Sequence, residues 1–130
     1  MTETYRKMNL IHKEITDKIL KSFYTVYDEL GYGFLEKIYE NALLLELSDA
    51  GLKCERQKPI KVYYKEQLIG EYFADIVVEN KVILEIKAAE SIAKEHEYQL
   101  INYLKATNVE IGLVLNFGKK PEFKRKINTK

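Results

Sequence analysis

Three stretches of the chain repeat apolar residues at the three- and four-residue spacing of an amphipathic helix. The first covers about residues 9–30 and ends at Gly31, which suits a left-handed C-terminal cap. The second covers about residues 35–50. The third is expected to begin after Ser91, as its N-cap, and to continue to about residue 106.

The segments between the second and third helices have the pattern of strands. Residues 60–64 alternate apolar and polar side chains, and Lys65-Glu66 is typical of a tight turn. Gly70 indicates a bulge or a close backbone approach in the strand that follows. Residues 72–78 and 81–87 are two apolar runs joined by a short polar turn, which predicts a hairpin.

Residues 111–115 are apolar almost throughout, as in a strand that is covered on both faces. Because this run follows a helix that itself follows a strand, a right-handed crossover should place it parallel to residues 82–87. The expected order is helix, helix, three strands, helix and strand, which predicts an α/β fold with a mixed sheet between helices on both faces. With 130 residues and no internal linker, the chain is expected to form one domain, residues 1–130.

Three charged residues interrupt the hairpin: Asp75 in its first strand, and Glu85 and Lys87 in its second. Charges are rare inside a buried strand unless they are paired or bind a metal. Glu85 and Lys87 lie two residues apart, so they share one face of the strand. Asp75 faces Glu85 across the pair only if the turn holds an odd number of residues or contains a bulge, and we expect one of these.

This group of charges has two explanations. Asp75 and Glu85 offer the hard oxygen ligands that Mg²⁺ or Mn²⁺ prefers, and Lys87 is close enough to contact a water on the same cation. A cation held in this way lowers the pKa of water and steadies charge on a phosphate. The same three residues would also form a purely structural ion network, and the pattern alone leaves both explanations open.

Two helices carry further polar residues at positions of interest. Glu36 lies on the same side of its helix as the apolar stripe, so we expect it to point inward. A glutamate in a first turn is equally well explained by the helix dipole. On the third helix His96, Gln99 and Tyr103 form one line, which is either a solvated face or part of a site.

The overall composition restricts the possible partners. The chain is 46% hydrophobic and 32% charged with a net charge of +1, so any phosphate-binding surface must be local. The basic residues within 119–126 form a tail that is either solvated or follows phosphates. Cys54 is the single cysteine, which excludes a disulfide framework and predicts a small buried side chain. No run is apolar enough to span a bilayer and the N-terminus is not a signal peptide, so we expect no membrane partner and a cytoplasmic protein.

The motifs together resemble a known family. Asp75, nine intervening residues and then Glu85-Ile86-Lys87 are similar to the signature of the PD-(D/E)XK nuclease superfamily, with Ala74 in place of the proline. Residues 33–39, Gly-Phe-Leu-Glu-Lys-Ile-Tyr, resemble the motif of the GxxExxY family within that superfamily. Residues 99–103, Gln-Leu-Ile-Asn-Tyr, resemble the QxxxY motif of its exonuclease-like branches. The resemblance implies a restriction-endonuclease-like three-layer fold of order α-α-β-β-β-α-β.

The resemblance also implies a role for each matched residue. Asp75 and Glu85 would bind Mg²⁺ or Mn²⁺ with the carbonyl group of Ile86, and Lys87 would position or activate the attacking water. Glu36 would reach the cation directly or through water. The remaining matched residues would steady the substrate phosphate or the site, with His96 at the rim. These residues are Gln99, Tyr103, Tyr39 and His96.

Two functional classes follow. The first is a metal-dependent nuclease that hydrolyses phosphodiester bonds of DNA or RNA by in-line attack of water. The alternative is a catalytically idle module that binds nucleic acid or a protein, because fold does not determine function. A junction-resolving enzyme is a third possibility. A small nuclease must pair to cut both strands of a duplex, so we expect a homodimer and DNA as the probable nucleic-acid partner.

Overall fold

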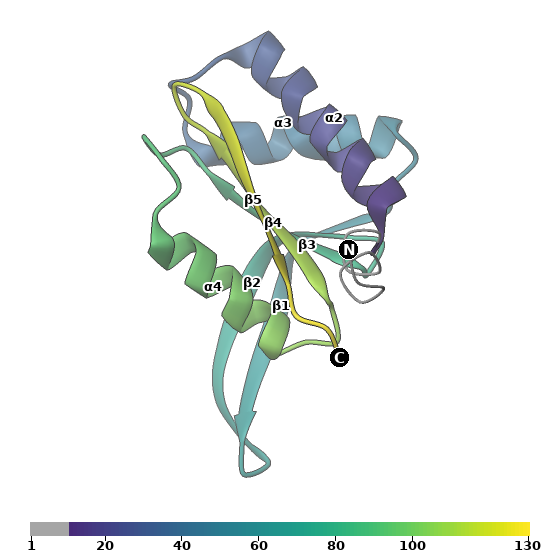
Figure 1. The fold of residues 1–130 in the computed structure, drawn as a ribbon, viewed down its shortest axis with the longest axis vertical. Coiled ribbons are helices and arrows are strands. Elements are labelled where there is room, and N and C mark those ends of the chain that lie inside the picture. Colours follow the sequence, from purple (N-terminus) through teal and green to yellow (C-terminus); the bar gives the residue numbers. More distant parts are fainter. Residues whose placement is uncertain (1–10) are drawn as a thin grey trace, which may run out of the picture.

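The structure of this protein is a computed structural model, and it describes residues 11–130. The described part of the chain contains three helices and five strands (Figure 1). None of its helices combines the length and the apolar character needed to cross a bilayer. The elements in chain order are α2 (Lys13–Leu30), α3 (Glu36–Asp49), β1 (Cys54–Tyr64), β2 (Gln67–Val78), β3 (Val82–Lys87), α4 (Lys94–Lys105), β4 (Ile111–Phe117) and β5 (Pro121–Ile127).

The strands form one mixed sheet in the order β1-β2-β3-β4-β5. Strands β3 and β4 are parallel and are connected through α4, as the sequence predicts, and the other three pairs are antiparallel. The carboxyl ends of β3 and β4 therefore lie at the same edge of the sheet, where Lys87 is paired with Asn116.

The sheet is covered on both faces. Alternate residues of β3 point to opposite sides: Val82, Leu84 and Ile86 pack into the core under α2 and α3, whereas Ile83 packs under α4. Figure 1 shows α2 and α3 together on one side and α4 alone on the other. The predicted α/β fold class, a mixed sheet between helices on both faces, is confirmed.

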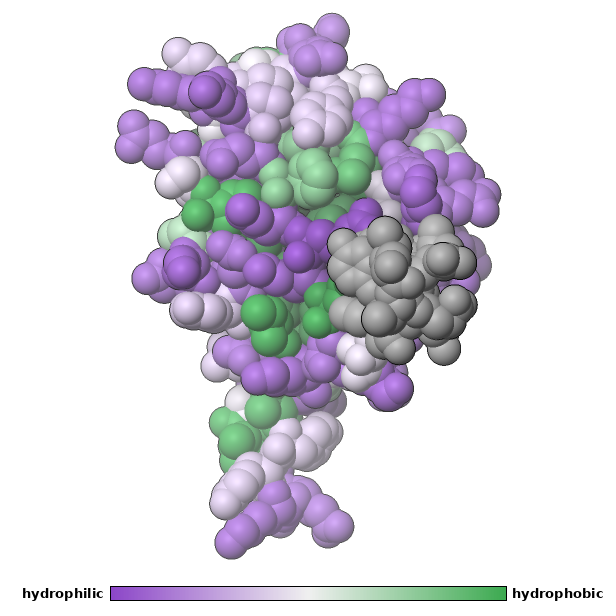
Figure 2. All heavy atoms as spheres, viewed as in Figure 1, coloured by the Kyte–Doolittle hydropathy of each residue, from purple (hydrophilic) through white to green (hydrophobic). Residues whose placement is uncertain are grey.

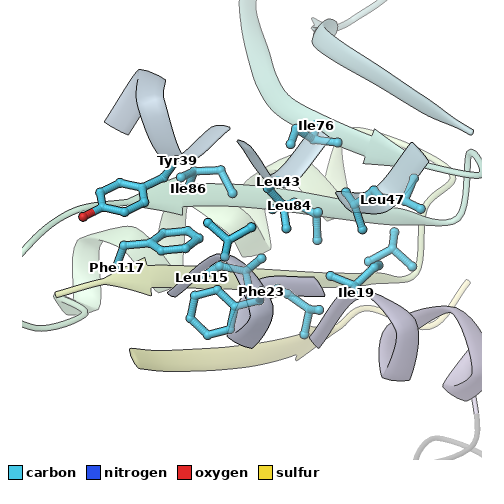
Figure 3. Packing of buried hydrophobic residues seen from close by; sticks show 14 of the residues in the cluster. Ile19, Phe23, Tyr39, Leu43, Leu47, Ile76, Leu84, Ile86, Leu115 and Phe117 are labelled. Carbon is cyan, nitrogen blue, oxygen red and sulfur yellow. The ribbon is translucent and has the colours of Figure 1, made fainter. Parts of the chain in front are cut away.

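Aromatic packing joins the two helices of the first layer to the sheet. Tyr39 of α3 stacks on Phe117 of β4, with ring centroids 4.3 Å apart and planes 13° apart. Phe23 of α2 meets the same Phe117 ring edge-on at 4.8 Å. These rings lie at one end of the buried cluster in Figure 3, so β4 anchors both helices.

The expected element order is wrong at its end, because the chain has one more strand. Residues 119–126 were expected to form a basic tail, but β5 pairs antiparallel with β4 along Ile111–Phe117. The charged side chains of β5 give its sequence no apolar alternation, so the sequence does not indicate a strand. Charges on an edge strand also oppose pairing with a strand of another molecule. Arg125 donates to the hydroxyl group of the buried Thr16 on α2, and Lys126 forms an ion pair with Glu97 on α4.

Two helix boundaries differ from those expected. The first helix begins at Lys13, residues 11–12 form a turn, and the expected start at residue 9 lies outside the described residues. The third helix, α4, is capped at Ala93 instead of Ser91. The reason is local, because His96 Nδ1 accepts a hydrogen bond from the Ala93 N–H group and satisfies a free helix donor.

Strands β1 and β2 continue beyond the sheet as a two-stranded arm (Figure 1). Only Ile76–Val78 of β2 pair with β3, while the β1–β2 ladder extends to Tyr64 and Gln67. The predicted turn at Lys65-Glu66 is present, and so is the irregularity expected near Gly70, where the register shifts. Figure 2 shows hydrophobic side chains along this arm and hydrophilic ones at its tip.

A buried asparagine holds the connection between β3 and α4. The Asn116 side chain is fully buried, and its amide group both accepts from the Ala89 N–H (2.9 Å) and donates to the Ala89 carbonyl group (3.0 Å). Next to it, Gly118 leaves no room for a side chain, because a Cβ atom there would collide with the same Ala89 carbonyl oxygen. These contacts fix the segment that follows Lys87.

Replacing Asn116 with alanine should therefore destabilise the protein. The Asn116→Ala variant leaves both polar backbone groups of Ala89 without their partner, which costs about 1–3 kcal/mol for each group that stays buried. Urea unfolding followed by circular dichroism should show a lower midpoint. Asn108→Ala, at an exposed position with no recorded side-chain hydrogen bond, should unfold like the wild type. Equal midpoints for the two variants would contradict the assigned role of Asn116.

Candidate active site

The hairpin turn brings the two interrupting acids face to face. Val78 pairs with Val82, so the turn holds three residues, Glu79-Asn80-Lys81. The register continues through Ile76 and Leu84 and places Asp75 opposite Glu85. The prediction of an odd-numbered turn is confirmed, and the two carboxyl groups meet between the same two strands.

Each of these carboxylates binds the backbone of the opposite strand. Glu85 Oε2 accepts from the Asp75 N–H group at 3.0 Å, and Asp75 Oδ2 accepts from the Ile86 N–H group at 2.7 Å. The β2–β3 ladder stops one residue earlier, at Ile76 and Leu84. Side-chain oxygens therefore replace the backbone ladder at the point where β2 leaves the sheet toward the arm.

The surroundings of the pair make its full ionisation unfavourable. Glu85 is only 3% exposed, and burial followed by the nearby Asp75 charge raises the pKa of Glu85 to about 8. Burial also raises the pKa of Asp75, and the Glu40 charge adds to this, while the hydrogen bond from Ile86 opposes it. Two acids that resist a second negative charge form a site that attracts a cation.

Lys87 lies two residues beyond Glu85 on the same strand and is half-buried. Its charge favours ionisation of both acids. Among residues 11–130, however, no ion pair within 4.0 Å includes Lys87. A closed structural network of the three charges would need such a contact, so this arrangement leaves the ammonium group available for another partner.

The expectation that Glu36 points inward is wrong. Its side chain is exposed in the first turn of α3, because the loop that precedes it does not cover that turn. The buried acid of α3 is Glu40, one turn later and 5% exposed. Glu40 lies near enough to Asp75 to raise its pKa.

Glu40 is held by a set of partners that the sequence interpretation missed. Gln57 of β1 donates to Glu40 Oε1 at 3.0 Å, while Lys37 and Arg56 lie 3.3 and 3.7 Å from Oε2. Gln57 stands opposite Asp75 in the ladder and has a left-handed backbone, with φ of 49°. Only the helical spacing of Glu40 to the buried positions 43 and 47 signalled its place, since pairing with Gln57 depends on tertiary structure.

Of the three residues that form one line on α4 (His96, Gln99 and Tyr103), only Tyr103 lies close enough to the two acids for their charges to act on it. Tyr103 lies close enough to Asp75 and Glu85 that their charges, after burial, raise the pKa of its phenol to about 12. Gln99, one turn earlier on the same side, is half-buried and has no recorded hydrogen bond. His96 caps the helix through Nδ1, as described above.

Tyr39 does not have the position expected of a residue that contacts substrate. It is fully buried, donates to the Gly31 carbonyl group at 2.7 Å and accepts from the Phe34 N–H group at 3.2 Å. A side chain enclosed in this way cannot touch a substrate. Its role is to hold the loop that leads into α3 and so to position the start of that helix.

The donor set of the pair fits a hard divalent cation. Within residues 11–130 no three His, Cys, Asp or Glu side chains are grouped to hold a metal. Mg²⁺ commonly uses one or two carboxylates and completes its octahedron with water, so the Asp75–Glu85 pair meets this requirement. The two backbone N–H groups use one oxygen of each acid, Glu85 Oε2 and Asp75 Oδ2, and the two carboxyl groups also interact with each other.

Comparisons with known proteins support the fold and the family. No curated protein matches the chain. The crystal structure of SSO0001 is similar, with a TM-score of 0.59 and 17% identity, over 72% of this chain and 50% of that one. This chain thus spans half the length of SSO0001, and the likeness concerns the fold alone. The family model described as the PD-(D/E)XK nuclease superfamily matches residues 13–126, which cover every element from α2 to β4 and all of β5 except its last residue. The chain therefore belongs to the PD-(D/E)XK nuclease superfamily.

Proposed function

We propose that this protein is a metal-dependent phosphodiesterase that hydrolyses nucleic acid at the Asp75–Glu85 pair. The observation that carries the proposal is the meeting of the buried Glu85 with the half-buried Asp75, beside an ammonium group that forms no ion pair within residues 11–130. Fold membership raises the expectation of nuclease chemistry, and the geometry of these residues supplies the specific site.

The residues at the site have distinct tasks in this proposal. Asp75, Glu85 and the Ile86 carbonyl group hold Mg²⁺ or Mn²⁺, which supplies positive charge at the phosphate and lowers the pKa of water. Lys87 donates hydrogen bonds that orient the attacking water for in-line attack, or offsets charge as it develops on the phosphate. Tyr103 is protonated at neutral pH, as an ordinary phenol is, and its raised pKa of about 12 extends this to alkaline pH, so it is a donor toward a phosphate oxygen.

The exposed position of Glu36 is compatible with a contact through water. Glu36 stands at the entrance to α3 beside Lys37, whose ammonium group pairs with the buried Glu40. We assign the chain to the GxxExxY branch of the superfamily on this motif, in which Tyr39 fixes the loop and thereby the position of Glu36. The homodimer expected for cleavage of both strands of a duplex remains a prediction that light scattering can test.

The first test of the proposal is hydrolysis. Lys87→Ala and Glu85→Gln should each lower the rate on labelled DNA or RNA with Mg²⁺ or Mn²⁺ by about a hundredfold or more, because each removes a group that acts on the reacting atoms. Product lengths on a denaturing gel measure the rate. Lys81→Ala and Glu29→Gln change exposed residues of the same charge and should leave the rate unaltered.

Hydrolysis that persists unchanged in both site variants would refute the proposal. A wild type that binds oligonucleotides but cuts none of them, with either cation, would instead favour the non-catalytic module. Glu85→Gln is close to isosteric with the native residue, so it keeps the volume of the buried site. Its far-ultraviolet circular dichroism spectrum checks that the fold is intact.

A second test compares the two acids of α3. Glu36→Gln should lower the rate of hydrolysis and leave the thermal midpoint unchanged, because the side chain is exposed. Glu40→Gln should lower the thermal midpoint, since the buried Glu40 is bound to Gln57 and lies beside two cations. A Glu36 variant with wild-type rates would remove this residue from the site.

A third test uses the pH dependence of stability without metal. The folded state holds the Glu85 proton more tightly than the unfolded chain, so this residue stabilises the fold fully below the ordinary glutamate pKa. That contribution is lost as the pH rises to about 8. In EDTA, the thermal midpoint of Glu85→Gln relative to wild type should therefore increase from pH 5 to pH 8.

Mg²⁺ should raise the thermal midpoint of the wild type more at the higher pH, where the acids are free to bind it. It should have little effect on Glu85→Gln, which lacks one of the two carboxylates. Glu71→Gln serves as the control and should follow the wild type throughout. A midpoint difference that is the same at both pH values would contradict the raised pKa of Glu85.

A further inference from the structure

A groove lies between α4 and the projecting arm, next to the proposed site. It has a volume of about 490 Å³, in the range of sites that hold a nucleotide-sized ligand. Three residues near the end of α4 form one wall, and the arm forms the other. The lining residues are Lys61, Val62, Tyr63, Tyr72, Asn102, Lys105 and Ala106.

Two tyrosine rings lie between the groove and the carboxylate pair. The lining residue Tyr72 stands three residues before Asp75 on β2, and its ring centroid lies 5.7 Å from that of Tyr103 on α4. A strand that leaves the site along β2 therefore reaches the groove at Tyr72.

The chemistry of the groove suits a phosphate backbone with bases. Two of its lining residues are lysines and none is acidic. Tyr63 and Tyr72 are 59% and 52% exposed, which is unusual for aromatic rings on a strand pair and leaves their faces open. Base–aromatic stacking beside cations that contact phosphates is the common design of surfaces that bind single strands.

Another surface between α4 and the sheet contains more cations but is less suited to phosphates. Lys94, Lys124 and Lys126 line it together with Glu97. Lys126 forms an ion pair with Glu97 at 2.6 Å, so one of its three cations is already neutralised by an acid in the same wall. The tyrosine-lined groove thus gives the better match to a polyanion.

We propose that the groove between α4 and the β1–β2 arm binds a single-stranded segment of nucleic acid that leads to or from the Asp75–Glu85 pair. The bases stack on Tyr63 and Tyr72, and Lys105 contacts a phosphate. A single strand is required because the faces of its bases are accessible, whereas in a duplex they are covered by their neighbours. The inference rests on the proposed function for the direction of the strand, but binding is measured independently of cleavage.

Fluorescence anisotropy in EDTA tests this binding with a short fluorescein-labelled oligothymidylate, alone or paired with oligodeoxyadenylate. Tyr63→Ala should weaken binding of the single strand by about fivefold to 150-fold, the range found when a stacking aromatic is removed. Tyr72→Phe keeps the ring and should bind like the wild type. Lys105→Gln should reduce the slope of log affinity against log salt by about 0.7, the loss of one phosphate contact.

Lys105 is the more informative lysine, because Lys61 stands directly opposite the acidic Glu71 in the β1–β2 ladder. Tyr24→Ala and Lys21→Gln are matched controls on α2, against the opposite face of the sheet, and should leave binding unchanged. Circular dichroism and thermal midpoints of all variants establish that they fold.

The possible results separate this inference from the proposed function. Wild-type affinity in both Tyr63→Ala and Lys105→Gln overturns the proposal that the groove binds the single strand. This holds even if Glu85→Gln and Lys87→Ala abolish cleavage. Tighter binding of the duplex than of the single strand, or no binding of either, also overturns it. Weaker binding in both groove variants supports it, even when the wild type cuts no substrate and the nuclease proposal fails.

Discussion

The site depends on two carboxylates that replace backbone hydrogen bonds between diverging strands. Asp75 and Glu85 each accept an N–H group of the opposite strand where the β2–β3 ladder ends. An unpaired N–H group in this place would be costly, so the acids are held there by the needs of the sheet itself. The same position desolvates them and sets them beside each other, which raises the pKa of both. The backbone contacts thus create a local excess of negative charge that a cation would relieve.

Helices on both faces of the sheet contribute side chains near these two acids. Helix α3 contributes Glu40, which is held by Gln57 of β1 near Asp75. Helix α4 contributes Tyr103 near Glu85 from the other face. The gap between β2 and β3 is therefore reached from both helical layers.

The motif residues of this chain separate into those that meet at the proposed site and those that hold other parts of the fold. Asp75, Glu85 and Lys87 are at the site, whereas Tyr39 holds the loop before α3 and His96 caps α4. The presence of a polar residue in a family motif is therefore not by itself evidence that this residue contacts a substrate. Hydrogen bonds to the backbone explain the positions of Tyr39 and His96.

The sequence by itself determined the helices, the central hairpin and its odd-numbered turn, because side-chain periodicity and local turn chemistry depend on neighbouring residues. It also determined that Asp75, Glu85 and Lys87 belong together. It did not reveal β5, whose lysines and arginine resemble a solvated tail until β4 offers it a partner. It placed Glu36 inward with Glu40 beside it, whereas only Glu40 is buried, since a helical wheel does not show which turns the rest of the chain covers. Only the tertiary structure decided the partners of Glu40, the burial of Tyr39 and the groove beside α4, because each depends on contacts between residues far apart in the chain.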